Sequence, residues 1–238
     1  MNLLVIDKKN WINDTTIRVE GRQYKHMLEV HKVELGDSIR VGELNGKIGE
    51  GILVRMDEES ADIEVELNRE PPNKLPIKLI LAMPRPKAMK RLIEDCTTLG
   101  IGEIHLIKTW KVEKSYWSTP WLSDEKLKEQ MLLGLEQGCD TILPKVSIHK
   151  YFKPFVEDEL PSIIEGTEAI VAHPRIDNKN SLSDFEEKAI TIAIGPEGGF
   201  TDYEIDCLEK IGFKAVNLGN RILRVETAIK VAIGRLYY

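Results

Sequence analysis

The chain has 238 residues, of which 42% are hydrophobic and 30% charged, and its formal net charge is −6. This composition is typical of a globular protein with a sizeable core, and the negative charge argues against a protein that coats nucleic acid without specificity. No apolar run reaches the length of a membrane span, and the start of the sequence lacks the zones of a signal peptide. The three cysteines are far apart, and the five histidines have no metal-ligand spacing. We therefore expect a cytoplasmic protein with no membrane partner and no metal.

Residues 1–70 have the pattern of several short strands around one helix. Asn45-Gly46 lies between two alternating segments and predicts a hairpin with a type I′ turn, because that turn needs positive φ angles. Strands are predicted on both sides of this turn and at 61–67, and a helix within 21–35. So many strands in so few residues favour a small β-barrel domain.

Residues 68–76 contain three prolines and mark the predicted domain boundary. From residue 75 to residue 238, strands and helices then alternate. Strands are predicted at 77–83, 103–109, 168–174, 189–195 and 214–219, and helices at 86–99, 123–138, 181–188, 201–212 and 226–238. This alternation predicts an α/β domain with a parallel sheet covered on both faces.

Three turns at the ends of predicted strands are candidates for ligand contact: 172–175, 195–199 and 218–224. Ligands of open parallel sheets bind beyond the carboxyl ends of the strands. Neither a dinucleotide fingerprint nor a P-loop is present. Thr201 and Glu204 form a capping box, so a helix should begin directly after Phe200. In the loop before it, we expect Gly198 to need positive φ and close ligand approach, so that Gly198→Val would abolish binding.

The pair GPEGGF and LGNRILRVETA resembles the RsmE group of ribosomal RNA methyltransferases, in the SPOUT (α/β-knot) superfamily. HMLEVHKVELGDSIRV is similar to the PUA-like RNA-binding barrel of that group. The resemblance implies a parallel-sheet methyltransferase domain with a trefoil knot, a homodimer contacting through the last helix, and S-adenosylmethionine as cofactor. It implies the following cofactor-binding residues: Val171, Ala172, His173, Ile194, Gly195, Pro196, Glu197, Gly198, Gly199, Leu218, Gly219, Ile222, Leu223 and Ala228. Of these, Leu218, Ile222, Leu223 and Ala228 would pack the adenine, or they would be core residues.

Arg224 and Glu226 are the candidate catalytic residues. Methyl transfer to uracil N3 requires loss of a proton and stabilisation of charge on the ring carbonyl oxygens. Arg224, a permanent cation, suits the second task, or it forms an ion pair with Glu226. Glu226 is a possible proton acceptor, although stabilisation of the first helical turn is favoured for it. Glu197 could contact a ligand or cap its turn.

The candidate RNA-binding residues lie in two groups. Arg22, His26 and Lys32 belong to the N-terminal segment that resembles a PUA-like domain. Arg85, Lys87, Lys90 and Arg91 lie in a stretch, 78–91, that contains no acid, so they could contact phosphate or form a solvated helix face. The segment 110–121 interleaves three tryptophans with two lysines, which suits base stacking, although burial is expected for at least one tryptophan.

The sequence therefore predicts methylation of N3 of a uridine in small-subunit ribosomal RNA, with that RNA or the small ribosomal subunit as partner. Two alternatives remain. Asp95 and Asp140 stand where the RsmE group usually has cations, which would suit a knot methyltransferase acting on another RNA or on a ribose 2′-oxygen. The other alternative is a non-catalytic RNA-binding or ribosome-assembly protein.

Overall fold

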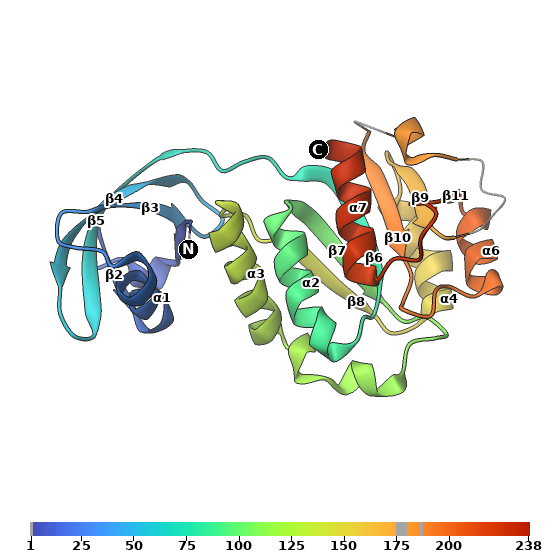
Figure 1. The fold of residues 1–238 in the computed structure, drawn as a ribbon, viewed down its shortest axis with the longest axis horizontal. Coiled ribbons are helices and arrows are strands. Elements are labelled where there is room, and N and C mark those ends of the chain that lie inside the picture. Colours follow the sequence, from blue (N-terminus) through green and yellow to red (C-terminus); the bar gives the residue numbers. More distant parts are fainter. Residues whose placement is uncertain (1, 175–179, 186–187) are drawn as a thin grey trace. The chain divides into compact units, whose positions relative to one another are not determined.

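The computed structural model of the chain describes residues 2–174, 180–185 and 188–238 (Figure 1). The chain forms two compact units. The first comprises Met1–Asn73, Glu94–Gly100 and Lys128–Leu143, and the second comprises Lys74–Ile93, Ile101–Leu127 and Pro144–Tyr238. The pattern along the chain did not predict that two later segments would join the N-terminal residues in one unit.

The first unit contains a five-stranded sheet in the order β1-β3-β4-β5-β2. Its strands are β1 (Leu4–Ile6), β2 (Thr16–Glu20), β3 (Ser38–Glu43), β4 (Ile48–Met56) and β5 (Ser60–Arg69). β1 runs parallel to β3, and the other neighbours are antiparallel. Alternate residues such as Ile17, Val19 and Ile63 are completely buried in its core. The predicted helix is α1 (Gly21–His26), which continues as a π-helical segment, Met27–His31, and ends at Lys32 with φ 50°.

The hairpin between β3 and β4 is confirmed, but the predicted type I′ turn is wrong. Asn45 has φ 60°, whereas Gly46 is not left-handed, and Glu43 N donates to Lys47 O across a four-residue connection. The connection is held from outside the hairpin. Asn45 N donates to Thr141 O (2.8 Å), and Asn45 Oδ1 accepts from Leu143 N (3.1 Å). These hydrogen bonds connect the turn to the segment that follows α3. They favour a turn geometry that differs from the type I′ turn expected of an isolated Asn-Gly hairpin.

The later segments of the first unit pack against its N-terminal strands. Leu135 of α3 (Asp124–Gly138) is completely buried with Leu3 and Val5. The neighbouring Glu136 has a side chain only 5% exposed, and its Oε1 accepts from Arg22 Nη2 (2.6 Å) and Gln23 Nε2 (2.9 Å). An apolar contact and a nearly buried carboxylate therefore depend on residues more than a hundred positions apart.

The second unit contains a six-stranded sheet in the order β11-β9-β10-β6-β7-β8, with every pair parallel. Its strands are β6 (Leu75–Ala82), β7 (Ile101–Ile107), β8 (Lys145–His149), β9 (Glu168–Ala172), β10 (Ile190–Ile194) and β11 (Lys214–Val216). The predicted parallel α/β domain is confirmed. Two parts of it were not predicted: β8, and the helical stretch α4 (Phe152–Pro154), π-helix Phe155–Glu159 and α5 (Leu160–Ile163).

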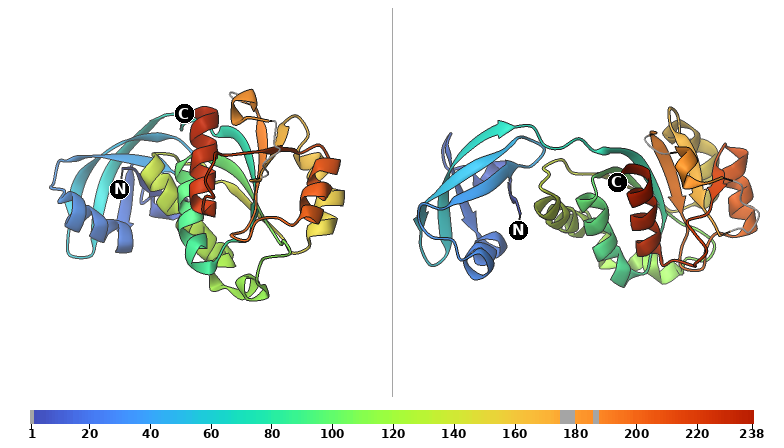
Figure 2. Two further views of the ribbon diagram at one scale, coloured as in Figure 1. Left: turned by 45° about the vertical axis from the view of Figure 1, so that its right-hand side comes forward. Right: turned by 45° about the horizontal axis from the view of Figure 1, so that its top comes forward.

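Helices lie on both faces of this sheet, as predicted (Figure 2). The N-terminal half of α2 (Pro86–Thr98) and α7 (Val225–Tyr237) lie on one face, and α6 (Asp202–Lys210) with the 152–163 stretch lies on the other. α2 begins at Pro86 and ends before Gly100, whose φ is 79°, both as predicted. In the predicted helix 181–188, a 3₁₀ turn covers Leu182–Phe185, and residues 186–187 lie outside the described residues. Two further 3₁₀ turns follow β7, at Lys114–Ser118 and Pro120–Leu122, and a fourth, Lys8–Asn10, follows β1.

No helix within the described residues has the length and apolar character needed to cross a bilayer.

Candidate active site

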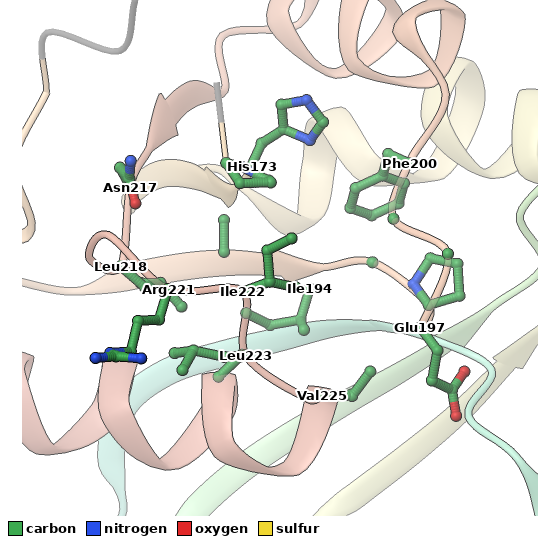
Figure 3. A pocket seen from close by; sticks show the side chains of 17 residues that line it. His173, Ile194, Glu197, Phe200, Asn217, Leu218, Arg221, Ile222, Leu223 and Val225 are labelled. Carbon is green, nitrogen blue, oxygen red and sulfur yellow. The ribbon is translucent and has the colours of Figure 1, made fainter. Parts of the chain in front are cut away.

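A cavity of about 260 Å³ opens beyond the carboxyl ends of β9, β10 and β11 in the second unit. Four segments surround it: the end of β9, the 194–200 loop, the 217–223 loop and the start of α7 (Figure 3). The lining residues are Ala172, His173, Pro174, Ile194, Gly195, Pro196, Glu197, Gly198, Gly199, Phe200, Asn217, Leu218, Arg221, Ile222, Leu223, Val225 and Ala228. Turns far apart in the sequence thus form one site.

Most of the predicted cofactor-binding residues line this cavity, and two do not. Val171 is completely buried within β9, and Gly219 lies in the 217–223 loop without lining the cavity. Arg175, the last residue of one predicted turn, lies outside the described residues. The residue-by-residue prediction of the cofactor pocket did not include Pro174, Phe200, Asn217 and Val225, which also line the cavity. Phe200 and Val225 lie within the two motifs themselves, and Pro174 and Asn217 are each next to a predicted cofactor-binding residue.

The glycines of the 195–199 loop have different roles, and the positive φ predicted for Gly198 is wrong. Positive φ occurs at Gly199 (69°) and not at Gly198. A Cβ at Gly198 would meet the flexible Lys111 side chain, with Cδ 3.1 Å away. At Gly195 a Cβ would lie 3.1 Å from Phe200 N and Cδ2. A glycine is therefore needed at position 195 because Phe200 approaches closely there. At position 199 a glycine is needed because the backbone is left-handed.

The glycine loop is fixed by three polar contacts. Thr201 and Glu204 form the predicted capping box at the start of α6. The buried Glu204 also accepts from Trp110 N through Oε1 (2.6 Å). Lys111 Nζ donates to Gly198 O (2.8 Å). Since Trp110 and Lys111 follow β7, this strand positions the loop that follows β10.

In the middle of the loop, Glu197 Oε1 lies 3.4 Å from Arg85 Nε. This ion pair joins a predicted cofactor-binding residue to a predicted phosphate-binding residue. Figure 3 shows Glu197 and Arg221 on opposite sides of the cavity. Among the lining residues, a carboxylate and a guanidinium therefore lie on opposite sides, and the carboxylate is paired with Arg85, which does not line the cavity.

The backbone of the 218–223 segment makes few hydrogen bonds to the described residues. Within the described part of the chain, it makes one backbone hydrogen bond, from Gly219 N to Asn217 Oδ1 (2.9 Å). Gly219 has φ 135°, a conformation that side chains rarely adopt. Ile222 is 92% exposed, although it is apolar and lines the cavity. Free amide and carbonyl groups beside an exposed apolar side chain suit a ligand with both polar and apolar surfaces.

Arg224 is the N-cap residue of α7, and its side chain is exposed. Among the described residues it forms no ion pair, so the alternative of a pair with Glu226 is not realised in this chain. A cation at a helix N-terminus faces the positive end of the helix dipole, which is unfavourable. Glu226, in the first turn of α7, has the favourable sign there. Arg224 lies between two lining residues, Leu223 and Val225, without lining the cavity itself.

The predicted RNA-binding residues are divided between the two units. Arg22 is half-exposed and holds Glu136, His26 is half-buried, and Lys32 is exposed. Arg85, Lys87, Lys90 and Arg91 are all exposed. Lys90 Nζ lies 5.6 Å from the centre of the Trp121 ring. Of the three tryptophans of 110–121, Trp117 and Trp121 are half-buried and Trp110 is 83% exposed.

A chain of titratable side chains crosses β7 and β8, away from the cavity. His105 Nδ1 lies 3.0 Å from His149 Nε2, and His105 Nε2 lies 3.0 Å from Glu103 Oε1. His105 is 3% exposed, and its burial lowers the pKa of the imidazole, against the opposing effect of Glu103. The neutral form of His105 is therefore favoured in the folded chain.

A parallel α/β unit with a cavity lined by turns is a fold and site that many enzyme families share, and comparison with known proteins defines the class. Residues 71–237 match the family described as "RNA methyltransferase domain". A Mesomycoplasma hyopneumoniae protein named ribosomal RNA small subunit methyltransferase E is 32% identical over 170 residues, covering 69% of this chain and 70% of that protein. A Treponema pallidum protein of the same name is 28% identical over 235 residues, covering 96% and 87%.

A solved Neisseria gonorrhoeae structure of that name, bound to S-adenosyl methionine, has a TM-score of 0.72 at 23% identity, and covers 97% of this chain and 95% of that one. This similarity shows a shared fold.

The family match and the Mesomycoplasma hyopneumoniae relative define the class. The chain belongs to the RNA methyltransferase domain family, and within it to the ribosomal RNA small subunit methyltransferases E.

Proposed function

We propose that this chain uses S-adenosylmethionine to methylate N3 of a uridine in small-subunit ribosomal RNA. Membership of the methyltransferase E family supports the RNA class. The observation that carries the cofactor assignment is the backbone of 218–223, which makes only one hydrogen bond within the described residues and lies beside the exposed Ile222.

The lining of the cavity fits this cofactor. Leu218, Ile222 and Leu223 offer an apolar surface for an adenine ring, and the free amide and carbonyl groups around them can bind its polar edges. Glu197 lies on the side opposite Arg221, so the cavity can hold a ligand that carries both a cationic and an anionic group. When bound, S-adenosylmethionine supplies the methyl group.

Arg224 is proposed to stabilise the reacting base. Uracil N3 is nucleophilic after it loses its proton, and the anion spreads its charge over two carbonyl oxygens. A guanidinium against one of these oxygens stabilises the anion and eases proton loss. Arg224 has no anionic partner among the described residues, so its charge is available. Glu226 is proposed to stabilise the first turn of α7, with proton acceptance as its alternative role.

The finer features of the fold are proposed on the family resemblance. They are a trefoil knot in the 75–238 domain, a PUA-like RNA-binding barrel at 1–70, and a homodimer formed through α7. A ribosomal RNA substrate places the protein in the cytoplasm. The half-buried Val231 of α7 and the exposed Tyr238 that follows this helix offer apolar surface for the two-fold contact.

The alternative of a knot methyltransferase that acts on another RNA or on a ribose 2′-oxygen rested on Asp95 and Asp140. Asp140 is 4% exposed, and its Oδ1 accepts from Thr141 N (2.6 Å) and Ile142 N (2.9 Å). Asp140 therefore stabilises a turn of the first unit, and its difference from the family pattern gives no reason to change the substrate.

Mass-spectrometric mapping of small-subunit ribosomal RNA from cells with and without the gene tests the proposal. We expect one N3-methyluridine to disappear, and to return when purified protein and S-adenosylmethionine are added to the undermethylated subunits. Loss of a ribose methylation instead, or an unchanged modification map, contradicts the proposal.

A further inference from the structure

A second cavity, of about 760 Å³, opens beside the start of α6. It is lined by residues from the 108–114 segment after β7, the 150–154 segment after β8 and the first turn of α6, and is called here the aromatic groove. Because β7, β8 and β10 are parallel, the ends of β7 and β8 lie at the same edge of the sheet as the first cavity. Figures 1 and 2 show α6 beside the α4 stretch that forms one wall.

Three exposed aromatic side chains converge on this groove. Trp110 is 83% exposed, Tyr151 70% and Tyr203 58%. Among the described residues, only one other aromatic side chain, Tyr238, is exposed to this degree. The rings come from three separate segments, so their convergence is a property of the fold and not of one sequence motif. Exposed apolar surface concentrated in this way indicates a binding site.

The charge of the groove is positive, although the protein carries a net charge of −6. Four lysines line it, Lys108, Lys114, Lys150 and Lys153, against the single carboxylate of Glu204. Glu204 is buried, and both its oxygens are occupied by Trp110 N and the Thr201 backbone and hydroxyl. Lys153 is paired with Glu157 (3.7 Å), which leaves three lysines facing the groove without a neighbouring acid in its lining. An anionic ligand is favoured.

The groove and the first cavity share their structural supports. Glu204 joins Trp110 to the helix that follows the glycine loop, and Lys111, next to Trp110, donates to Gly198 O. Phe200 lines the first cavity, and the following residue, Thr201, lines the groove. The two cavities therefore border the same short stretch of chain.

We propose that the aromatic groove binds unpaired nucleotides of the substrate RNA that flank the methylated nucleotide; this inference rests on the proposed function. Bases stack on Trp110, Tyr151 and Tyr203, and the lysine ammonium groups contact phosphates. A duplex hides the faces of its bases and leaves the rings without a stacking partner. A protein partner with an apolar surface would leave the lysines without anions. Single-stranded RNA satisfies both the rings and the charges.

Filter binding with the full-length protein tests the inference. The probes are a single-stranded oligouridine of about ten nucleotides, within the usual site size of such grooves, and a duplex of equal length. We expect Trp110→Ala and Tyr151→Ala each to weaken oligouridine binding by about tenfold, the size of one lost stacking contact. Trp110→Phe keeps a ring and should retain most of the affinity. Lys150→Ala should weaken binding, whereas Lys210→Ala, at the exposed far end of α6, should not.

Calorimetry with S-adenosylmethionine on the same variants separates this inference from the proposed function. Cofactor affinity should be equal in wild type, Trp110→Ala and Tyr151→Ala. If oligouridine binding is unaffected by both alanine variants, or if the duplex binds as tightly and loses the same affinity, the aromatic groove is not a single-strand site. If the wild-type protein binds no S-adenosylmethionine, the proposed function fails, whatever the groove binds.

Discussion

Arg224 has an exposed guanidinium that forms no ion pair with any residue the structure describes, and it stands at an unfavourable position, the N-terminus of α7. Ser, Thr, Asn or Asp would cap this helix better, since their side chains accept from its free amides. Asn217 and Thr201, at the two loops of the cavity, do make such local contacts. A residue that departs from local preference at the edge of a ligand cavity is more informative than the many that follow it.

Arg224→Ala should leave S-adenosylmethionine affinity nearly unchanged, because Arg224 does not line the cavity. We expect single-turnover methylation to slow by about a hundredfold or more, the usual effect of removing one group that stabilises transition-state charge. Arg224→Lys should recover little, since a point charge does not reproduce the planar fork. Normal methylation by the alanine variant would assign Arg224 a structural role.

Gly199 and Gly198 form a matched pair for testing the glycine loop. Gly199→Val places a β-branched side chain at φ 69°, which costs about 1–3 kcal/mol, so we expect cofactor affinity to fall by about tenfold or more. Gly198→Ala meets only the flexible Lys111 side chain and should bind nearly as wild type. Calorimetry on both variants checks this. Equal losses would mean that φ at residue 199 does not control the loop.

At the scale of single elements, the periodic segments were predictable and the edge elements were not. β6 and β10 are mostly apolar because both of their faces are covered, and the sequence shows them directly despite Lys78 and Thr191. β8 is an edge strand with a mixed burial pattern, so its period is weak. The geometry of the turn at Asn45-Gly46 depends on a hydrogen bond to the distant Thr141, and no local sequence pattern includes that contact. In the site, the motifs located the loops, but the convergence of Trp110, Tyr151 and Tyr203 required the fold.

The exposed cations of α2 provide a test at this scale. Lys87 and Arg91 have no ion pair among the described residues, whereas Arg85 is held by Glu197. Replacing Lys87 and Arg91 by Ala should weaken RNA binding and flatten its dependence on log salt by about 0.7 to 0.9 per lost phosphate contact. Arg85→Ala should change the slope less and also disturb cofactor binding through Glu197. A salt slope equal to wild type in the double variant would assign these residues to a solvated face.

The buried histidine of β7, His105, should make the stability of the chain depend on pH. Burial lowers the pKa of His105 from its ordinary value of 6.5, so the unfolded chain binds a proton more readily than the folded chain. The contribution of neutral His105 to the free energy of unfolding is fully present above that pH value and is lost as the pH falls below it. Urea unfolding should show a smaller loss of stability between pH 7 and pH 5 in His105→Gln than in wild type. The difference should appear over about the pH range in which an ordinary imidazole titrates. Identical pH profiles of stability in wild type and His105→Gln would exclude His105 as a source of the pH dependence.

At the scale of the whole molecule, the first unit is built from three stretches of chain rather than from its first seventy residues alone. Leu135 and Glu136, in α3, complete its core and its nearly buried ion pair. Removing residues 1–73 would expose Leu135 and leave the Glu136 carboxylate without Arg22 and Gln23. A truncated 75–238 chain is therefore expected to lose stability for reasons unrelated to RNA.

Arg22→Ala is the sharper test of this arrangement. It leaves Glu136 nearly buried with Gln23 as its remaining side-chain partner, and we expect a loss of about 1–3 kcal/mol in the free energy of unfolding. Arg40→Ala is the control and should change stability little, because within the described ranges the one side-chain hydrogen bond of Arg40 runs from Nη1 to Cys139 Sγ at 3.3 Å. Urea titration of both variants gives the values. Equal stability of Arg22→Ala and wild type would mean that the ion pair is not needed for the unit.

The exposure of Trp110 has a practical consequence for optical work on this protein. The chain has four tryptophans, and the other three, Trp11, Trp117 and Trp121, are partly shielded from solvent. Trp110 should therefore dominate the long-wavelength edge of the intrinsic emission, and a water-soluble collisional quencher such as iodide should reach it first. The native chain thus carries a fluorophore at one defined surface position, and no attached dye is needed to report when that position is covered.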